Sequence, residues 1–116
     1  MKVGIIDYGS GNLHSAKKAF ERAVVDAGSA DLIELVTDPD ALLTFDRIVL
    51  PGVGAFGACM DALRANGLEG VVHEAVGSGR PFLGICVGYQ ALFERSEEFN
   101  SCALGLGIFK GPVVRF

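Results

Sequence analysis

Residues 81–88 read Pro-Phe-Leu-Gly-Ile-Cys-Val-Gly and place one cysteine between two glycines, just after an apolar run. The run predicts a strand over Phe82–Ile85, and the residues that follow predict a helix from about Tyr89 to Arg95. A G-x-C-x-G turn between a strand and a helix is the thiol form of the nucleophile elbow. The N–H groups where the helix begins, chiefly that of Val87, are suited to hold an oxyanion. We therefore predict that Cys86 is a nucleophile; the alternative is a small buried hydrophobic side chain.

Short apolar runs alternate with amphipathic stretches along the rest of the chain. Further strands are predicted at Val3–Ile6, Leu32–Val36 and Arg47–Leu50. Helices are predicted over residues 13–27, 39–45, 58–66 and 68–78, with Asn12 and Asp38 before the first two and breaks at Gly28 and Gly67. Strands that are apolar throughout and alternate with helices indicate a parallel sheet covered on both faces.

We therefore expect residues 1–116 to form one domain with an open, doubly wound α/β fold of the flavodoxin-like type. The end of the chain, residues 111–116, looks like a strand that is just beginning. A sheet ending there would have an unprotected edge, so we expect the chain to be the first part of a longer domain.

Composition excludes several classes of protein. The chain of 116 residues is 50% hydrophobic and 21% charged, which favours a folded globular domain over a disordered segment. The net charge of −4, without a basic run, argues against nucleic acid as a partner. No apolar stretch approaches the ~20 residues of a membrane-spanning helix, so we expect a soluble, cytoplasmic protein without membrane contact.

The three cysteines show no C-x-x-C spacing, which argues against a zinc site or a disulfide framework. Cys59 and Cys102 lack the setting of an elbow, and we expect both to fill space.

The turns after the first and third predicted strands share the rim of the sheet with the elbow, because ligands bind beyond the carboxyl ends of parallel strands. Residues 51–57 form a glycine-rich loop that is a candidate for holding substrate or completing an oxyanion hole. Residues 9–11 begin like a dinucleotide fingerprint, but His14 stands where its third glycine belongs. We expect no cofactor and no metal.

Acid–base groups are scarce on this rim. Gln90, one turn into the predicted elbow helix, is a candidate substrate contact. A thiol nucleophile usually needs a histidine base, and the chain has only His14 and His73. Neither has an acidic residue in an obvious orienting position.

The sequence resembles the class I glutamine amidotransferases. Within that class it is similar to the glutaminase subunits of imidazole glycerol phosphate synthase, from histidine biosynthesis. The resemblance rests on the motifs D-Y-G-S-G-N-L at 7–13, L-P-G-V-G-A-F-G at 50–57, P-F-L-G-I-C-V-G at 81–88, and G-L-G at 105–107 with V-R-F at 114–116.

The resemblance implies a role for five residues. Cys86 would attack the side-chain amide of glutamine to give a glutamyl thioester and ammonia, and water would then release glutamate. Gly52 and Gln90 would hold the glutamine, while Val53 and Val87 would supply N–H groups to the oxyanion. The implied partner is a cyclase subunit with a (β/α)8 barrel, which would receive the ammonia and form imidazole glycerol phosphate.

The chain also departs from the family pattern. Tyr89 stands where the family usually has methionine, and His14 where it usually has arginine. The family's catalytic histidine and glutamate lie beyond residue 116, so we expect the chain alone not to turn over glutamine. Two alternatives stay open, namely a non-catalytic remnant that keeps the fold and partner surface, and the glutaminase component of another amidotransferase, such as anthranilate synthase. A phosphoacceptor receiver domain shares the fold, but Pro51-Gly52 stands where that class needs its aspartate.

Overall fold

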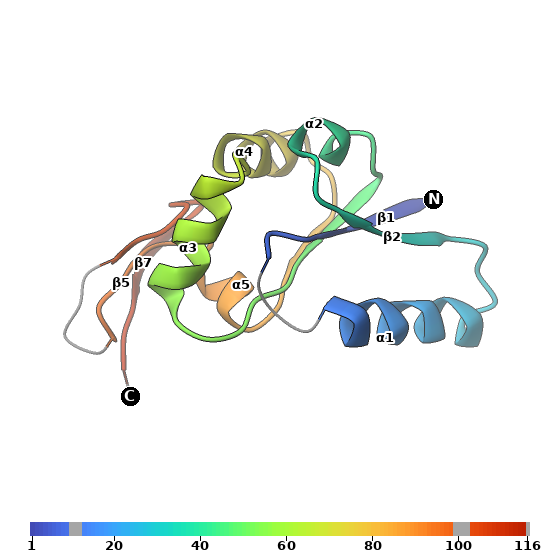
Figure 1. The fold of residues 1–116 in the computed structure, drawn as a ribbon, viewed down its shortest axis with the longest axis horizontal. Coiled ribbons are helices and arrows are strands. Elements are labelled where there is room, and N and C mark those ends of the chain that lie inside the picture. Colours follow the sequence, from blue (N-terminus) through green and yellow to red (C-terminus); the bar gives the residue numbers. More distant parts are fainter. Residues whose placement is uncertain (10–12, 99–102, 116) are drawn as a thin grey trace.

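A parallel sheet forms the centre of the computed structural model, which describes residues 1–9, 13–98 and 103–115 (Figure 1). Its four strands run in the order β2-β1-β3-β4. They are β1 (Lys2–Ile6), β2 (Leu32–Val36), β3 (Arg47–Leu50) and β4 (Phe82–Gly84). The connecting helices are α1 (Leu13–Asp26), α2 (Pro39–Leu42), α3 (Phe56–Ala65) and α4 (Glu69–Gly77). The predicted open α/β fold with a parallel sheet is confirmed.

Strand register brings two of the predicted rim turns together. Leu50, the last residue of β3, pairs with Gly84, the last residue of β4. The Ile85 N–H then donates to the Leu50 carbonyl at 3.0 Å and extends the pairing by one step. The loop after β3 and the turn after β4 therefore leave the sheet side by side.

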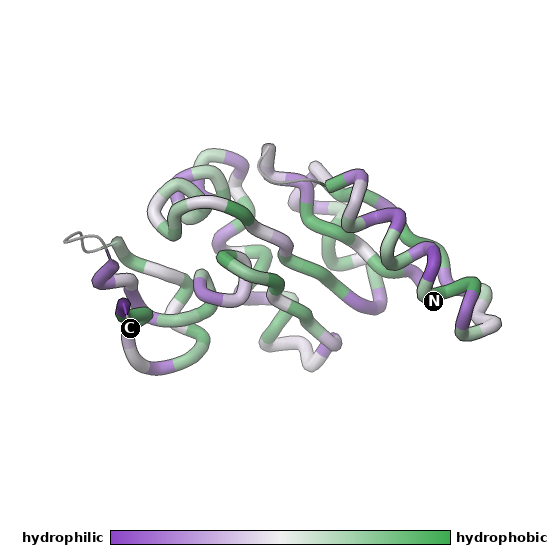
Figure 2. Tube along the Cα trace, turned by 90° about the horizontal axis from the view of Figure 1, so that it is seen from below, coloured by the Kyte–Doolittle hydropathy of each residue, from purple (hydrophilic) through white to green (hydrophobic). Residues whose placement is uncertain are grey.

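Helices cover both faces of the sheet. On one face, Val3, Ile5, Ile33 and Val49 pack with Phe20 and Val24 of α1. On the other face, a larger buried cluster joins the sheet to α2, α3 and α4; it includes Ile6, Ile48, Leu50, Leu42, Met60, Leu63 and Val72. Hydrophilic and hydrophobic residues alternate along α1, as expected of a helix with one face toward solvent (Figure 2). The doubly wound arrangement is thus confirmed.

Local signals in the sequence set most helix ends. The Asp38 carboxylate accepts the Asp40 N–H at 2.9 Å and caps α2, whose first residue is a proline. Gly67 has φ +68° and separates α3 from α4. The helix predicted over 39–45 is shorter than expected, because α2 ends at Leu42 and gives way to isolated turn hydrogen bonds. Asn12, the predicted cap of α1, lies outside the described residues.

The predicted helix from Tyr89 to Arg95 is wrong. The helix α5 spans only Val87–Gln90, and β5 (Phe93–Ser96) follows it. β5 forms a second sheet of order β6-β5-β7 with β6 (Ala103–Leu104) and β7 (Phe109–Val113). The hydrogen bonds offered by β6 and β7, which come later in the chain, override the local pattern at 93–96. The strand expected from residue 111 begins two residues earlier, at Phe109.

No helix within the described ranges is long and apolar enough to cross a membrane.

Asp31 ties the start of the chain to the second strand. Its carboxylate accepts a hydrogen bond from the N-terminal ammonium of Met1 at 2.9 Å, and Arg47 lies 3.9 Å away. The bond to the ammonium, the bond to Ser29 and the charge of Arg47 hold the pKa of Asp31 below its usual value of 3.8.

A lowered pKa in the folded state adds stability above the ordinary pKa, and that stability is lost as the pH falls through the folded value. We therefore expect Asp31→Asn to lower the urea midpoint at pH 7 and to match the unsubstituted chain in strong acid. Urea unfolding across this pH range tests the prediction. Asp61→Asn removes the same charge from the exposed side of α3. The difference in urea midpoint between this control and the unsubstituted chain should not show the same dependence on pH.

Candidate active site

Cys86 occupies a sharp turn between β4 and α5. Its backbone has φ 54° and ψ −125°, and it is the only non-glycine with positive φ among the described residues. Residues other than glycine rarely adopt such a conformation, and those that do cluster at functional sites. The side chain is exposed. The turn therefore presents the thiol to solvent at the rim of the sheet, as a nucleophile elbow does.

Two glycines allow this turn because no side chain would fit at either position. A Cβ on Gly88 would overlap the carbonyl oxygen of Leu50, and a Cβ on Gly84 would lie 2.7 Å from the Cα of Tyr89. These neighbours are main-chain atoms, which cannot rotate away as a side chain can. The first turn of α5 is therefore packed against the ends of β3 and β4.

The loop after β3 contacts the same turn. Gly52 is buried, and a Cβ there would lie 2.7 Å from the main-chain nitrogen of Gly88. Gly54 has φ +86°, a conformation that glycine adopts without strain. Val53, between these glycines, is 55% exposed. The backbone of the loop thus lies directly against the elbow.

Two hollows open beside the elbow. The larger, of about 650 Å³, is lined by Cys86, Tyr89, Gln90 and Glu98 together with residues from β5, β7 and the end of the chain. The smaller, of about 210 Å³, is lined by residues 54–57 of the loop and by Val87, Gln90 and Glu98. Gln90 and Glu98 line both hollows, so the two adjoin along these side chains.

The structure brings together four of the five predicted site residues. Cys86 and Gln90 share the larger hollow, Val87 and Gln90 share the smaller one, and Gly52 lies against the elbow backbone. Val53 lines neither hollow.

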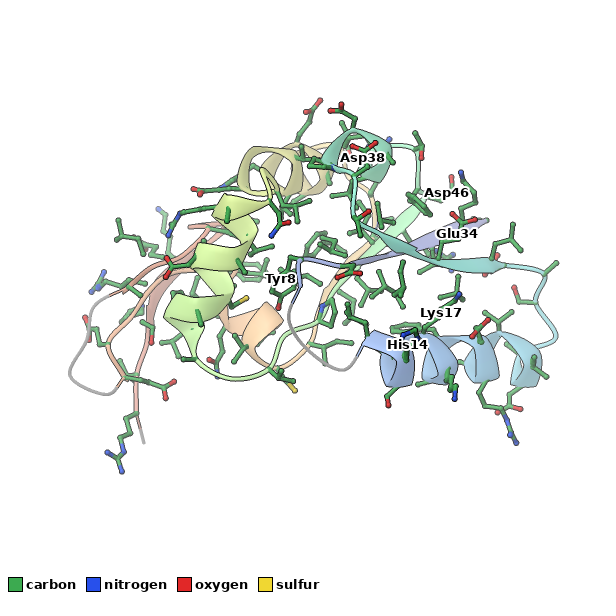
Figure 3. All side chains as sticks on the ribbon, viewed as in Figure 1. Tyr8, His14, Lys17, Glu34, Asp38 and Asp46 are labelled. Carbon is green, nitrogen blue, oxygen red and sulfur yellow. The ribbon has the colours of Figure 1, made fainter. Side chains whose placement is uncertain are left out.

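The two histidines lie on helices other than the one that follows Cys86. His14 is in the first turn of α1, on the opposite side of the described sheet from α3 (Figure 3). His73 lies in α4, and neither histidine lines the two hollows. Within residues 1–9, 13–98 and 103–115, no three His, Cys, Asp or Glu side chains form a group able to hold a metal ion.

Sequence reasoning missed Glu98. Glu98 follows β5, and because a helix had been predicted there, the sequence did not indicate that the Glu98 carboxylate would lie near Cys86. In the structure Glu98 is the acidic residue that lines the Cys86 hollow. A carboxylate there suits a ligand that carries an ammonium group.

Cys59 is buried, whereas Cys86 is exposed. Cys59 is 1% exposed, and burial raises the pKa of its thiol. Because the thiolate is the reactive form, Cys59 is expected to be inert. It fills space in the core as predicted, whereas Cys102 lies outside the described residues.

A third, mostly apolar groove of about 320 Å³ lies away from this rim, between α1 and the strands β3 and β4. Its walls include Phe20, Val24 and Leu83, and no cysteine or histidine lines it.

Comparison with known proteins gives one consistent family. The model of the family "Glutamine amidotransferase class-I" matches residues 5–110. The chain is 52% identical over 115 residues to the imidazole glycerol phosphate synthase subunit HisH of Mesorhizobium japonicum, covering 97% of this chain and 53% of that protein. It is 49% identical over 113 residues to the subunit of the same name from Nocardia farcinica, covering 97% and 51%. The chain thus spans about half the length of the curated relatives it matches.

Solved structures show the same fold. A crystal structure described as a glutamine amidotransferase superposes with a TM-score of 0.72 at 22% identity, over 97% of this chain and 56% of that one. A structure described as a putative peptidase E protein from Listeria monocytogenes gives a TM-score of 0.69 at 16% identity, over 93% and 62%. At these identities the likeness concerns the fold alone.

Proposed function

The chain belongs to the class I glutamine amidotransferase family, and on that premise we propose that it is the glutaminase part of an imidazole glycerol phosphate synthase. In this proposal Cys86 attacks the side-chain carbonyl carbon of glutamine, and the tetrahedral intermediate expels ammonia. The γ-glutamyl thioester left on Cys86 is then hydrolysed to glutamate. The observation that carries the proposal is the positive φ of Cys86 at an exposed turn that the Gly52 loop contacts.

The remaining roles follow from position. The N–H of Val87 is the first of α5 and has no acceptor within that helix, so it is available to an oxyanion. Because α5 is a single turn, directed N–H groups, rather than the dipole of a long helix, would stabilise the charge. Val53 supplies the second N–H once the loop turns toward the thiol. Gly52 and Gln90 hold the glutamine, and Glu98 receives its α-ammonium group.

We also propose a partner. The similar proteins are named as a subunit of imidazole glycerol phosphate synthase, which supports a cyclase subunit as the destination of the ammonia. The (β/α)8 barrel of that cyclase stays a prediction. The cytoplasmic location also stays a prediction, as does the absence of a cofactor, a metal, and contact with nucleic acid or membrane. Two further predictions stay open: residues 1–116 form the N-terminal part of one domain, and the chain alone is inactive.

Selective labelling tests the proposal. A chloromethyl ketone with the side-chain length, α-amino group and α-carboxylate of glutamine is expected to alkylate Cys86 at least roughly tenfold faster than Cys59 or Cys102, because only an accessible, recognised thiol reacts quickly. Peptide mapping by mass spectrometry gives the three rates, and added glutamine should slow only the reaction at Cys86.

Iodoacetamide, which carries no glutamine-like groups, is the matched control. A preference for Cys86 that is the same with both reagents would indicate an exposed thiol without a substrate site, in agreement with a non-catalytic remnant. Equal labelling of all three cysteines by the ketone would contradict the elbow itself.

A further inference from the structure

Tyr8 is a buried polar residue that the reaction described above does not use. It lies two residues beyond the end of β1 and is 2% exposed. Its hydroxyl donates a hydrogen bond of 2.6 Å to the carbonyl oxygen of Pro51, 43 residues later in the chain. Figure 3 shows Tyr8 between the end of β1 and α3. The first residue of the glycine-rich loop is therefore held by a side chain from the turn after β1.

The helix α3 and the residue after it hold Tyr8 in turn. The Cys59 thiol donates to the Tyr8 hydroxyl at 3.4 Å, and the Asn66 side-chain amide donates to the Tyr8 carbonyl at 3.2 Å. The hydroxyl and the carbonyl of Tyr8 are thus both hydrogen-bonded to α3 or to the residue that follows it. The hydroxyl donates to Pro51 and accepts from Cys59.

The position of the Tyr8 hydroxyl coincides with the contact between the loop and the elbow. An ideal Cβ on Gly52 would lie 2.8 Å from the Tyr8 hydroxyl and 2.7 Å from the nitrogen of Gly88. The hydroxyl, the Gly52 backbone and the start of α5 therefore meet at one point. Few changes at Tyr8 would leave this contact undisturbed.

We propose that Tyr8 is a positioning residue that fixes the Pro51–Gly54 loop for oxyanion binding at Cys86; this deepens the proposed function and rests on it. The proline ring fixes φ at Pro51, and the bond from Tyr8 fixes the direction of its carbonyl. The orientation of the Val53 N–H then depends only on the few backbone angles of Gly52 and Val53. Tyr8 thereby limits the movement of the loop to rotation about these backbone angles.

A single acylation step provides the test, because it needs the oxyanion site but no acid for the leaving group. In a γ-glutamyl para-nitrophenyl ester, the Cys86 thiolate attacks the ester carbonyl and forms the C–S bond. The oxyanion then collapses, the C–O bond breaks, and para-nitrophenolate leaves with the electron pair. The γ-glutamyl thioester stays on Cys86, so the release of nitrophenolate and the gain in protein mass report the same event.

Tyr8→Phe, which keeps the ring and removes the hydroxyl, is expected to slow this acylation at least about tenfold, because displacing a reacting group by about 1 Å can cost up to ~100-fold. Alkylation of Cys86 by iodoacetamide passes through no oxyanion and should stay within about twofold of the unsubstituted rate. Unchanged acylation in a folded Tyr8→Phe chain would overturn the proposal, as would an equal loss with both reagents.

Ser78→Ala is the matched control. The Ser78 hydroxyl also donates to a main-chain carbonyl at 2.6 Å, but it follows α4 and precedes the start of β4, far along the sheet from Cys86. Its loss should leave the ratio of the two rates unchanged. A ratio that falls equally in Ser78→Ala would mean that any lost hydroxyl bond has this effect, and the proposal would fail.

A second measurement covers the case in which Tyr8→Phe does not fold. The chain has two tyrosines, so fluorotyrosine gives two fluorine NMR signals, which Tyr89→Phe assigns. Acylation should shift the Tyr8 signal, and carbamidomethylation should not; an unmoved Tyr8 signal on acylation overturns the proposal. If the unsubstituted chain shows no acylation of Cys86 by the ester, the proposed function fails, which is a different result from any of these.

Discussion

Gly88→Ala is expected to abolish acylation of Cys86 by the γ-glutamyl para-nitrophenyl ester. The new Cβ would overlap the Leu50 carbonyl oxygen and lie 3.0 Å from the carbonyl carbon of Pro51. Both neighbours are main-chain atoms at the end of β3, so the first turn of α5 must move as a unit. That movement displaces the Val87 N–H and the loop that carries Val53. Since one oxyanion donor is typically worth about 100- to 1,000-fold, loss of both should lower the rate by more than ~1,000-fold.

Gly70→Ala makes the same substitution at the second residue of another helix, α4, where a Cβ would meet no atom within 4 Å. Alanine there should be neutral or stabilising, because it is the better helix former by up to ~1 kcal/mol. Stopped-flow measurement of acylation and thermal unfolding of both variants separate the effect on the acylation rate from the effect on stability. Gly88→Ala should also lose about 1–3 kcal/mol of stability through overpacking. If Gly88→Ala acylates at the unsubstituted rate, the elbow tolerates a side chain at this position and the prediction is wrong.

Local sequence signals predict the sheet and the elbow well. The strands at Leu32–Val36 and Arg47–Leu50 have the predicted bounds. Short apolar runs bounded by turn residues leave the backbone few other ways to satisfy its hydrogen bonds while burying its side chains. The same holds for Cys86, because glycines on both sides permit a turn that other residues would block.

Features that depend on contacts between distant parts of the chain cannot be predicted from local sequence signals. β5 pairs with β6 and β7, which come later in the chain, whereas the local sequence predicted a helix up to Arg95. Glu98 was missed as a consequence, since its place near Cys86 depends on that strand. Tyr8 carries no local signal either, because its acceptor at Pro51 lies 43 residues later, in the loop after β3, and only the fold brings the two together.

The loop after β3 illustrates both cases. Its glycines and its place on the rim follow from the sequence, and the family resemblance implied that Gly52 would hold the glutamine. The structure adds a steric reason for glycine at position 52, because the loop contacts both Tyr8 and Gly88 there and leaves no room for a Cβ. Gly54, with φ +86° and nothing within 4 Å of its ideal Cβ, has the conformational role instead.

Gly52→Ala is expected to slow acylation of Cys86 by about 100- to 1,000-fold, the usual effect of losing one oxyanion donor. Its Cβ would stand 2.7 Å from the Gly88 nitrogen and 2.8 Å from the Tyr8 hydroxyl, so the loop must lift from the elbow and carry the Val53 N–H away. The Val87 N–H stays in place, which is why the effect should be smaller than that of Gly88→Ala.

Gly77→Ala, at the last residue of α4 with no atom within 4 Å of the new Cβ, provides the comparison and should acylate normally. The combination Tyr8→Phe with Gly52→Ala sharpens the test, because a loop that has already lifted no longer depends on the Tyr8 hydroxyl. The double variant should therefore be scarcely slower than Gly52→Ala alone, in contrast to the additive losses expected of independent sites. Fully additive losses would show that Tyr8 and Gly52 act on Cys86 by separate routes, and an unchanged rate in Gly52→Ala would remove the loop from the catalytic site.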